Sequence, residues 1–90
     1  MDLDQMLQIL ASQDGSDLYL ATGAPPCAKF QGILKTLNET PLLPGEVARI
    51  AHDIMDEEQR LAFERDLEMN LALSLHKVGR FRVNIFKQRN

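Results

Sequence analysis

Near its end the chain places a large apolar side chain at every second residue, with mostly polar residues between them, and this pattern limits the folds open to it more than any other feature. The alternation runs over residues 69–75 and resumes over residues 80–86, after Val78-Gly79. Period two is typical of a strand with one buried face, because successive side chains of a strand point to opposite faces of the sheet. We therefore predict two antiparallel strands joined by a turn at Val78-Gly79.

Apolar residues recur at helical spacing in the earlier part of the chain. The two stripes consist of Leu3, Met6, Leu7 and Leu10, then Val47, Ile50, Ala51 and Ile54. Positions i, i+3, i+4 and i+7 lie on one face of an α-helix, so each stripe predicts an amphipathic helix. Asp2 with Gln5 resembles a capping box for the first helix. Asp14-Gly15 is predicted to end that helix, with the glycine at a positive φ.

A third helix and three further strands complete the prediction. Asp56 is placed as the N-cap of a helix that ends near Asp66. Residues 17–21 predict a short strand, and residues 27–37 predict a hairpin that turns at Gln31-Gly32. A chain of 90 residues has room for one small domain. The sequence therefore predicts a single α+β domain over residues 1–90, with about five strands and about three helices.

Charge is distributed very unevenly along the chain. All 13 acidic residues lie at or before Glu68. Five of the ten basic residues lie after it, namely Lys77, Arg80, Arg82, Lys87 and Arg89. Residues 1–76, called the body here, carry five basic and 13 acidic residues and a net charge of −8, and the terminal segment, residues 77–90, carries +5. Together they give the net charge of −3. A segment of one sign on a body of the other indicates an anionic partner.

The final strand concentrates this positive charge on one face. Arg80 and Arg82 point the same way and lie roughly 7 Å apart, because alternate side chains of a strand share a face. Asn84 shares that face. Arginine presents a planar fork of donors that suits phosphate or carboxylate oxygens. The alternative is a solvated edge strand with basic side chains that prevent aggregation, but the lack of any acid over residues 69–90 favours an anion site.

The sequence contains no recognisable catalytic or metal-binding motif. His52 and His76 have no second ligand at metal spacing. Neither Gly15-Ser16-Asp17 nor Gly23–Pro26 has the Gly-x4-Gly-Lys-Ser/Thr pattern that cradles phosphates. The single cysteine, Cys27, fits a reducing cytoplasm, and no apolar run approaches the roughly 20 residues of a membrane helix. We therefore predict no catalytic residue and no metal ligand in this chain.

Nucleic acid is an alternative anionic partner for the basic strand. Proteins that bind single strands combine basic grooves with aromatic side chains on which bases stack. Phe86 falls on the arginine face, but Phe81 falls on the opposite, apolar face. The −8 charge of the body would repel a long polyanion, so a small anion such as a nucleotide phosphate fits the patch better.

Five stretches of the sequence resemble, in their order and spacing, a known family. They are Gly15–Leu20 (GSDLYL), Gly23–Pro26 (GAPP), Gln31-Gly32, Ile54–Arg60 (IMDEEQR) and Gly79–Asn90 (GRFRVNIFKQRN). Together they are similar to the N-terminal domain of the type IV pilus retraction ATPases, the PilT/PilU family of the secretion ATPases. The resemblance covers essentially all 90 residues. The closing motif is its most specific part, and the chain leans toward the PilU branch.

The resemblance implies a PAS-like antiparallel sheet flanked by helices, within a larger cytoplasmic protein whose next domain is a RecA-like ATPase. Such proteins form homo-hexamers that power pilus retraction and twitching motility, and they associate with the inner membrane through the pilus machinery. The full-length proteins use ATP and Mg²⁺, and ATP sits at the junction of the two domains, where arginines of the N-terminal domain reach toward its phosphates. Carried over to this chain, the implied nucleotide-binding residues are Arg80, Arg82 and Arg89.

The sequence departs from the family pattern at two points. It stops at Asn90, before the family's last strand and before any Walker motif. We therefore expect no bound cofactor and no ATPase activity in the isolated chain, and an exposed sheet edge through which two copies can pair. Tyr19 stands where many relatives have histidine. Two other functions stay open at this point: a free-standing PAS-like sensory or adaptor module, and a small nucleic-acid-binding domain.

Overall fold

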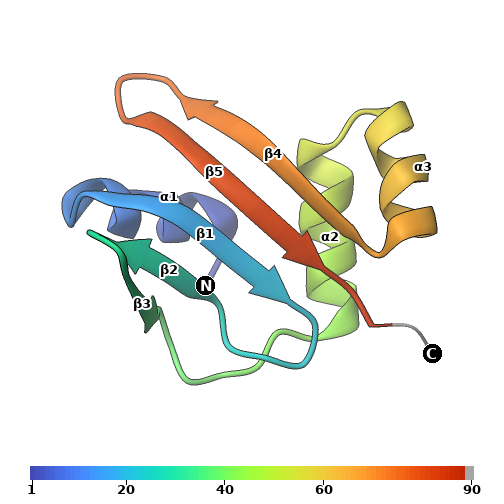
Figure 1. Ribbon diagram of the computed structural model, residues 1–90, viewed down its shortest axis with the longest axis horizontal. Helices are drawn as coiled ribbons and strands as arrows, with labels where there is room; N and C mark the ends of the chain where they lie inside the picture. Colours follow the sequence, from blue (N-terminus) through green and yellow to red (C-terminus); the bar gives the residue numbers. More distant parts are fainter. Residues whose placement is uncertain (89–90) are drawn as a thin grey trace.

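The computed structural model describes residues 1–88. This part of the chain contains three helices and five strands, joined by turns and loops (Figure 1). In chain order they are α1 (Leu3–Ser12), β1 (Gly15–Ala21), β2 (Cys27–Phe30), β3 (Ile33–Thr36), α2 (Pro44–Ile54), α3 (Glu57–Asp66), β4 (Glu68–Leu75) and β5 (Gly79–Phe86). Their number and type agree with the sequence prediction. None of the helices within these residues has the length and hydrophobicity of a membrane span.

The strands form one mixed sheet in the order β3-β2-β1-β5-β4. Neighbouring strands are antiparallel, except that β1 and β5 run parallel at the centre. The predicted α+β fold is confirmed, while the expectation of an antiparallel sheet is wrong for this one pair. A parallel pair needs a long crossover, and here all the elements from β2 to β4 supply it. Alternation in a sequence predicts which face of a strand is buried, but it does not fix the direction of a distant partner strand.

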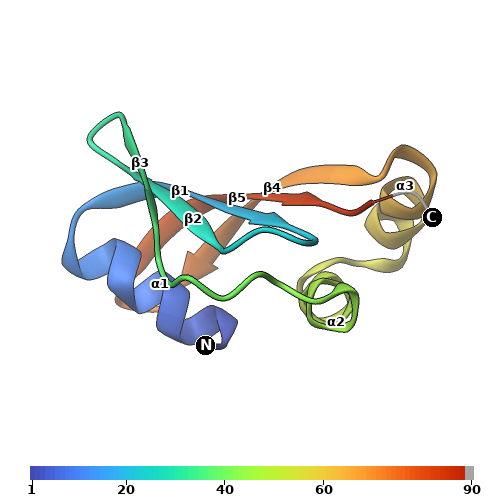
Figure 2. The same cartoon turned by 90° about the horizontal axis from the view of Figure 1, so that it is seen from below.

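One face of the sheet carries the hydrophobic core, and α1 and α2 cover that face (Figure 2). The buried apolar side chains come from the sheet, from all three helices and from the residues that flank α2: Met6, Leu7, Leu10, Leu18, Leu20, Ala28, Phe30, Leu42, Val47, Ala51, Met55, Phe63, Phe81, Val83 and Ile85. The members on β5 are the ones that the alternation predicts. Among the described elements, no helix lies over the opposite face of the sheet (Figure 2). That face is called the open face below.

The helices α1 and α3 begin with the capping residues that the sequence predicts. Asp2 accepts a hydrogen bond from the backbone N–H of Gln5, and the Gln5 side chain accepts one from the backbone N–H of Asp2, both at 2.8 Å. Asp56 and Gln59 repeat this reciprocal arrangement at 2.8 and 2.9 Å. Each pair satisfies two N–H groups that have no partner within the helix. Both predicted caps are confirmed.

The turn after α1 differs from the prediction. Asp14, with a φ of 61°, takes the left-handed conformation in place of Gly15. Gly15 already belongs to β1, where a Cβ atom would lie 2.9 Å from Cγ of Leu10 and 3.0 Å from Cε1 of Phe30. The glycine is therefore required by the close packing of α1 on the sheet, and the backbone conformation at that position does not require it.

The two hairpin turns follow the prediction in one case and shift in the other. Gln31 and Gly32 have φ values of 52° and 82°, as a two-residue turn with two positive φ angles demands. The turn between β4 and β5 lies over residues 76–78, slightly before the predicted position, because Gly79 pairs with Leu75 as the first residue of β5. Lys77, with a φ of 61°, supplies the left-handed residue of that turn.

The contacts of Gly15 predict that replacing it will destabilise the domain. We expect Gly15→Ala to lower the free energy of unfolding by about 1–3 kcal/mol, the usual effect of forcing an extra methyl group into a packed site. Gly45→Ala is the matched control, because a Cβ atom there meets nothing within 4 Å inside a helix, and it should be neutral or stabilising. Urea unfolding followed by circular dichroism measures both, and equal midpoints would contradict the packing role.

Candidate functional site

The open face of the sheet gathers the polar side chains of its central strands. Asp17 on β1 lies in register with Lys29 on β2 and with Arg82 on β5. One step along, Tyr19 lies in register with Cys27 and Asn84. The sequence prediction placed Arg80, Arg82 and Asn84 together on a polar face, and the strand register puts them on this one.

Arg80 and Arg82 are both exposed on β5. They lie opposite Ser74 and Ala72 of β4. A shallow hollow of about 440 Å³ runs over this part of the sheet, and its lining includes both arginines and Asn70. The third predicted residue, Arg89, lies outside the described residues. Two of the three predicted phosphate-binding arginines therefore lie together on one accessible surface.

Arg82 forms an ion pair with a buried carboxylate. Its Nε atom lies 2.7 Å from Oδ1 of Asp17, and the hydroxyl of Ser16 donates a hydrogen bond to Oδ2 of Asp17 at 2.7 Å. The Asp17 side chain is only 7% exposed, whereas the Arg82 side chain is 68% exposed. A buried carboxylate is costly unless it is paired and hydrogen-bonded, and here both oxygens have a partner.

An irregularity in β1 directs Asp17 to the open face. Gly15 pairs with Phe30 and Asp17 pairs with Lys29, so Ser16 is an extra residue relative to β2. In a regular strand, residues 15 and 17 would point to the same face. The extra residue lets Gly15 face α1 while Asp17 faces Arg82, which is how a bulge re-aims a side chain. Asp17 was not predicted as a site residue, although aspartate is depleted within strands and its position there was a usable signal.

Asn84 shares the face of the arginines but is used within the sheet. It is 8% exposed, and its Nδ2 donates a hydrogen bond to the backbone oxygen of Leu18 at 3.3 Å. Arg80, in contrast, makes no side-chain hydrogen bond or ion pair within residues 1–88. The arginines therefore differ in kind: Arg82 is held by a carboxylate and Arg80 is not held by any described residue.

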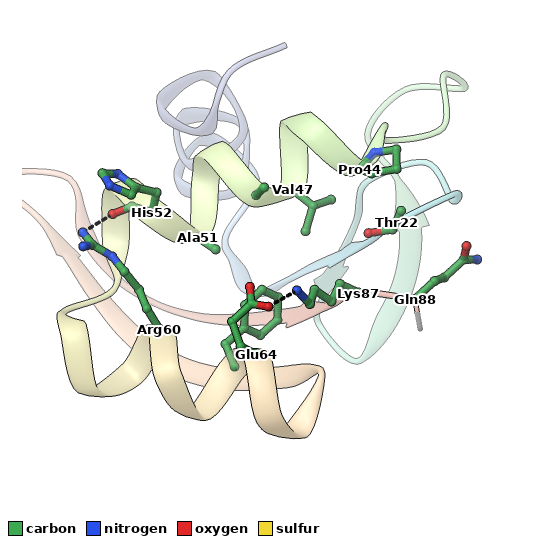
Figure 3. Close-up of a pocket in the computed structure, with 11 residues that line it drawn as sticks. Thr22, Pro44, Val47, Ala51, His52, Arg60, Glu64, Lys87 and Gln88 are labelled. Atoms are coloured by element: carbon green, nitrogen blue, oxygen red, sulfur yellow. Dashed lines mark hydrogen bonds and ion pairs between the residues drawn. The ribbon is translucent and has the colours of Figure 1, made fainter. Parts of the chain in front are cut away.

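A second hollow, of about 380 Å³, lies between α2, α3 and the segment after β5 (Figure 3). Its cations are engaged within the fold. Lys87 Nζ lies 2.6 Å from Oε2 of Glu64 and 5.7 Å from the ring centroid of Phe63. Arg60 donates a hydrogen bond to the backbone oxygen of His52 at 2.6 Å. The basic residues of the terminal segment therefore lie on different sides of the molecule: Lys87 packs against α3, whereas Arg80 and Arg82 lie on the open face.

The arrangement on the open face is suited to binding an anion. Two guanidinium groups project from alternate residues of one strand, and each offers several N–H donors to phosphate or carboxylate oxygens. Within residues 1–88 there is no grouping of three or more side chains that could ligate a metal ion. The chemistry available to these residues is the electrostatic stabilisation of a bound anion.

The different surroundings of the two arginines predict different effects on stability. Arg82→Ala removes the cation from a buried carboxylate, so we expect the free energy of unfolding to fall by about 1–2 kcal/mol. Arg80→Ala on the same strand face should change it by less than about 0.5 kcal/mol, as is usual for exposed residues without partners. Urea unfolding of the two variants tests this. Equal losses would show that Asp17 does not depend on Arg82.

Comparison with known proteins gives relatives that the chain matches from end to end. No family model matches the chain. The type IV pilus ATPase PilU of Pseudomonas aeruginosa is 37% identical to it over 90 residues, which is 100% of this chain and 24% of that protein. The type IV pilus retraction ATPase PilT of the same organism is 39% identical over 88 residues, which is 98% of this chain and 26% of that protein. The chain thus spans about a quarter of the length of these relatives.

A solved structure agrees with these relatives. The crystal structure of the pilus retraction motor PilT with bound ADP superimposes with a TM-score of 0.75 and 30% sequence identity. The match covers 99% of this chain and 26% of that one. The α+β arrangement of this chain is therefore the arrangement of one part of that motor.

Proposed function

This chain belongs to the PilT/PilU family of type IV pilus ATPases, as the N-terminal domain, and we propose that it supplies the arginine side of a nucleotide site in a pilus retraction motor. The observation that carries the proposal is the exposed pair Arg80 and Arg82 on a sheet face that no described helix covers. Arg89 joins them in the proposal through the sequence motif. The domain thus contributes charge, and it does not contribute a catalytic base or nucleophile.

The proposed chemistry is electrostatic stabilisation of a phosphoryl group. Phosphoryl transfer depends mostly on positioning and on neutralising the charge that develops on the phosphate oxygens. Cationic donors that are already in place stabilise that charge without reorganising during the reaction. Arg82, which is paired with Asp17, is the more fixed of the two donors, and Arg80 adds a guanidinium that has no partner within residues 1–88 and is free to contact phosphate. ATP and Mg²⁺ would be bound by the RecA-like domain, which we place in the part of the relatives that this chain does not span.

The proposed partners follow from a nucleotide site that is shared between this domain and the RecA-like domain. The domain would contact its own ATPase domain and the neighbouring subunits of a homo-hexamer, so that ATP hydrolysis changes the relative orientation of domains and drives pilus retraction and twitching motility. The motor would work in the cytoplasm, attached to the inner membrane through the pilus machinery. A nucleic-acid role is less well supported, because the −8 charge of residues 1–76 would repel a long polyanion.

Substitution of the arginines in the full-length ATPase tests the proposal. We expect Arg80→Ala and Arg82→Ala each to lower kcat for ATP hydrolysis by about a hundredfold to a thousandfold, the range found when one preorganised charge-stabilising donor is removed. Thermal unfolding should confirm that each variant is folded at the assay temperature. Lys77→Ala is a matched control, because it removes a positive charge from the exposed turn of the same hairpin. If turnover is unchanged in the Arg80, Arg82 and Arg89 variants alike, the proposal is wrong.

The isolated chain gives a second test. We expect no measurable ATP hydrolysis from residues 1–90, and at most very weak ATP binding in calorimetry, because two arginines on an open surface are exposed to water and screened by salt. Adding Mg²⁺ should not change this result. Hydrolysis by the purified chain at a rate comparable with that of the full-length motor would show that the active site is complete within this domain.

A further inference from the structure

We propose that Asp17 is a positioning residue of this arginine site, and that it holds Arg82 so that the terminal guanidinium nitrogens are left for phosphate. This inference rests on the proposed function. It assigns different tasks to the two arginines: Arg82 is a fixed donor and Arg80 is an adaptable one. It also gives a task to the Ser16-Asp17 pair, which lies in the first strand, more than 60 residues away in the sequence.

The geometry of the ion pair supports the role of Asp17. The atom of Arg82 that approaches the carboxylate is Nε, at 2.7 Å from Oδ1. This contact is an ion pair and is not aligned as a hydrogen bond, and neither terminal nitrogen of Arg82 donates a hydrogen bond to any residue within 1–88. An arginine carries five N–H donors, of which four belong to the two terminal nitrogens. Pairing through Nε therefore restrains the side chain close to its stem and leaves the donor-rich end for another anion.

The two ends of the pair differ in a way that makes Asp17 the anchor. Asp17 is 5% exposed, its second oxygen accepts a hydrogen bond from Ser16 at 2.7 Å, and the irregular register of β1 fixes where it points. The Arg82 side chain is 68% exposed. A buried carboxylate that accepts a hydrogen bond from a neighbouring hydroxyl has few alternative positions, whereas an exposed arginine has many. Asp17 therefore restrains the position of the Arg82 side chain, and not the reverse.

Lys29, the other cation in register with Asp17, does not take over this role. Its Nζ lies 5.9 Å from the centroid of the Tyr19 ring, and it forms no ion pair with Asp17 within 4.0 Å. Arg80 lies two residues from Arg82 on the same strand face and points the same way. Of the three cations on this part of the open face, Arg82 alone is paired with the buried carboxylate.

The opposite reading of the same ion pair makes a different prediction. If Asp17 only neutralised Arg82, it would weaken the site for anions, and removing its charge would strengthen nucleotide binding. If Asp17 positions Arg82, removing its charge lets the guanidinium move, and the site loses affinity and rate even though it gains net positive charge. The sign of the effect of Asp17→Asn therefore separates the two readings.

Steady-state ATP hydrolysis by the full-length protein provides the test. We expect Asp17→Asn to lower kcat/KM by about tenfold or more, since a displaced binding group or a lost charged hydrogen bond has effects of this size. Ser16→Ala keeps the charge and should lower kcat/KM by a smaller factor in the same direction. Asp14→Asn removes the same charge at a left-handed turn position, where asparagine is well tolerated, and should leave kcat/KM unchanged. All assays are run at a temperature where circular dichroism shows each variant folded.

Comparing Arg82→Ala with Asp17→Asn distinguishes a failure of the positioning role from a failure of the proposed function. If Arg82→Ala lowers kcat but Asp17→Asn leaves kcat/KM unchanged or raises it, the arginine site stands and the positioning role of Asp17 is overturned. If Arg82→Ala has no effect on turnover, the proposed function itself fails for that residue. Should Asp17→Asn not fold, Ser16→Ala decides, and unchanged kcat/KM in that variant overturns the inference.

Discussion

The parallel pairing of β1 and β5 is the constraint on which the rest of the structure depends. It joins an N-terminal unit, made of β1 and the β2-β3 hairpin, to the β4-β5 hairpin at the end of the chain. On the core side it aligns Leu18 with Val83 and Leu20 with Ile85, all of them buried. On the open face the same register aligns Asp17 with Arg82. One set of backbone hydrogen bonds thus fixes the centre of the core and brings together the charged pair of the candidate site.

The two faces of the sheet use polar groups in different ways. The helical face is apolar, and the cations near its end, Lys87 and Arg60, are held by a carboxylate and a backbone oxygen. The open face has two buried polar residues, Asp17 and Asn84, and each has a partner on the neighbouring strand. Satisfied polar groups of this kind fix the register of the central strands, because a slip of one residue would leave a carboxylate or an amide buried without a partner.

Much of the fold follows from local patterns that depend on few neighbours. The capping residues Asp2 and Asp56, the Gln31-Gly32 turn and the alternation over residues 80–86 were all predictable, because each depends on interactions within a few positions of the chain. The sequence predictions were wrong where a contact between distant residues determines the local structure. Gly15 was assigned to a helix stop, yet its small size is needed because Leu10 and Phe30 pack against it. The direction of β1 relative to β5 could not be predicted for the same reason.

The basic segment at the end of the chain shows where sequence information stops. The sequence by itself determined that Arg80 and Arg82 share a strand face, since that follows from the two-residue period of a strand. Only the tertiary structure decided that Lys87 forms an ion pair with Glu64 on the helical side and that Arg82 forms one with Asp17. Ion pairs between residues so far apart in sequence depend on strand order, register and the extra residue at Ser16, and none of these is encoded in the spacing of charges along the chain.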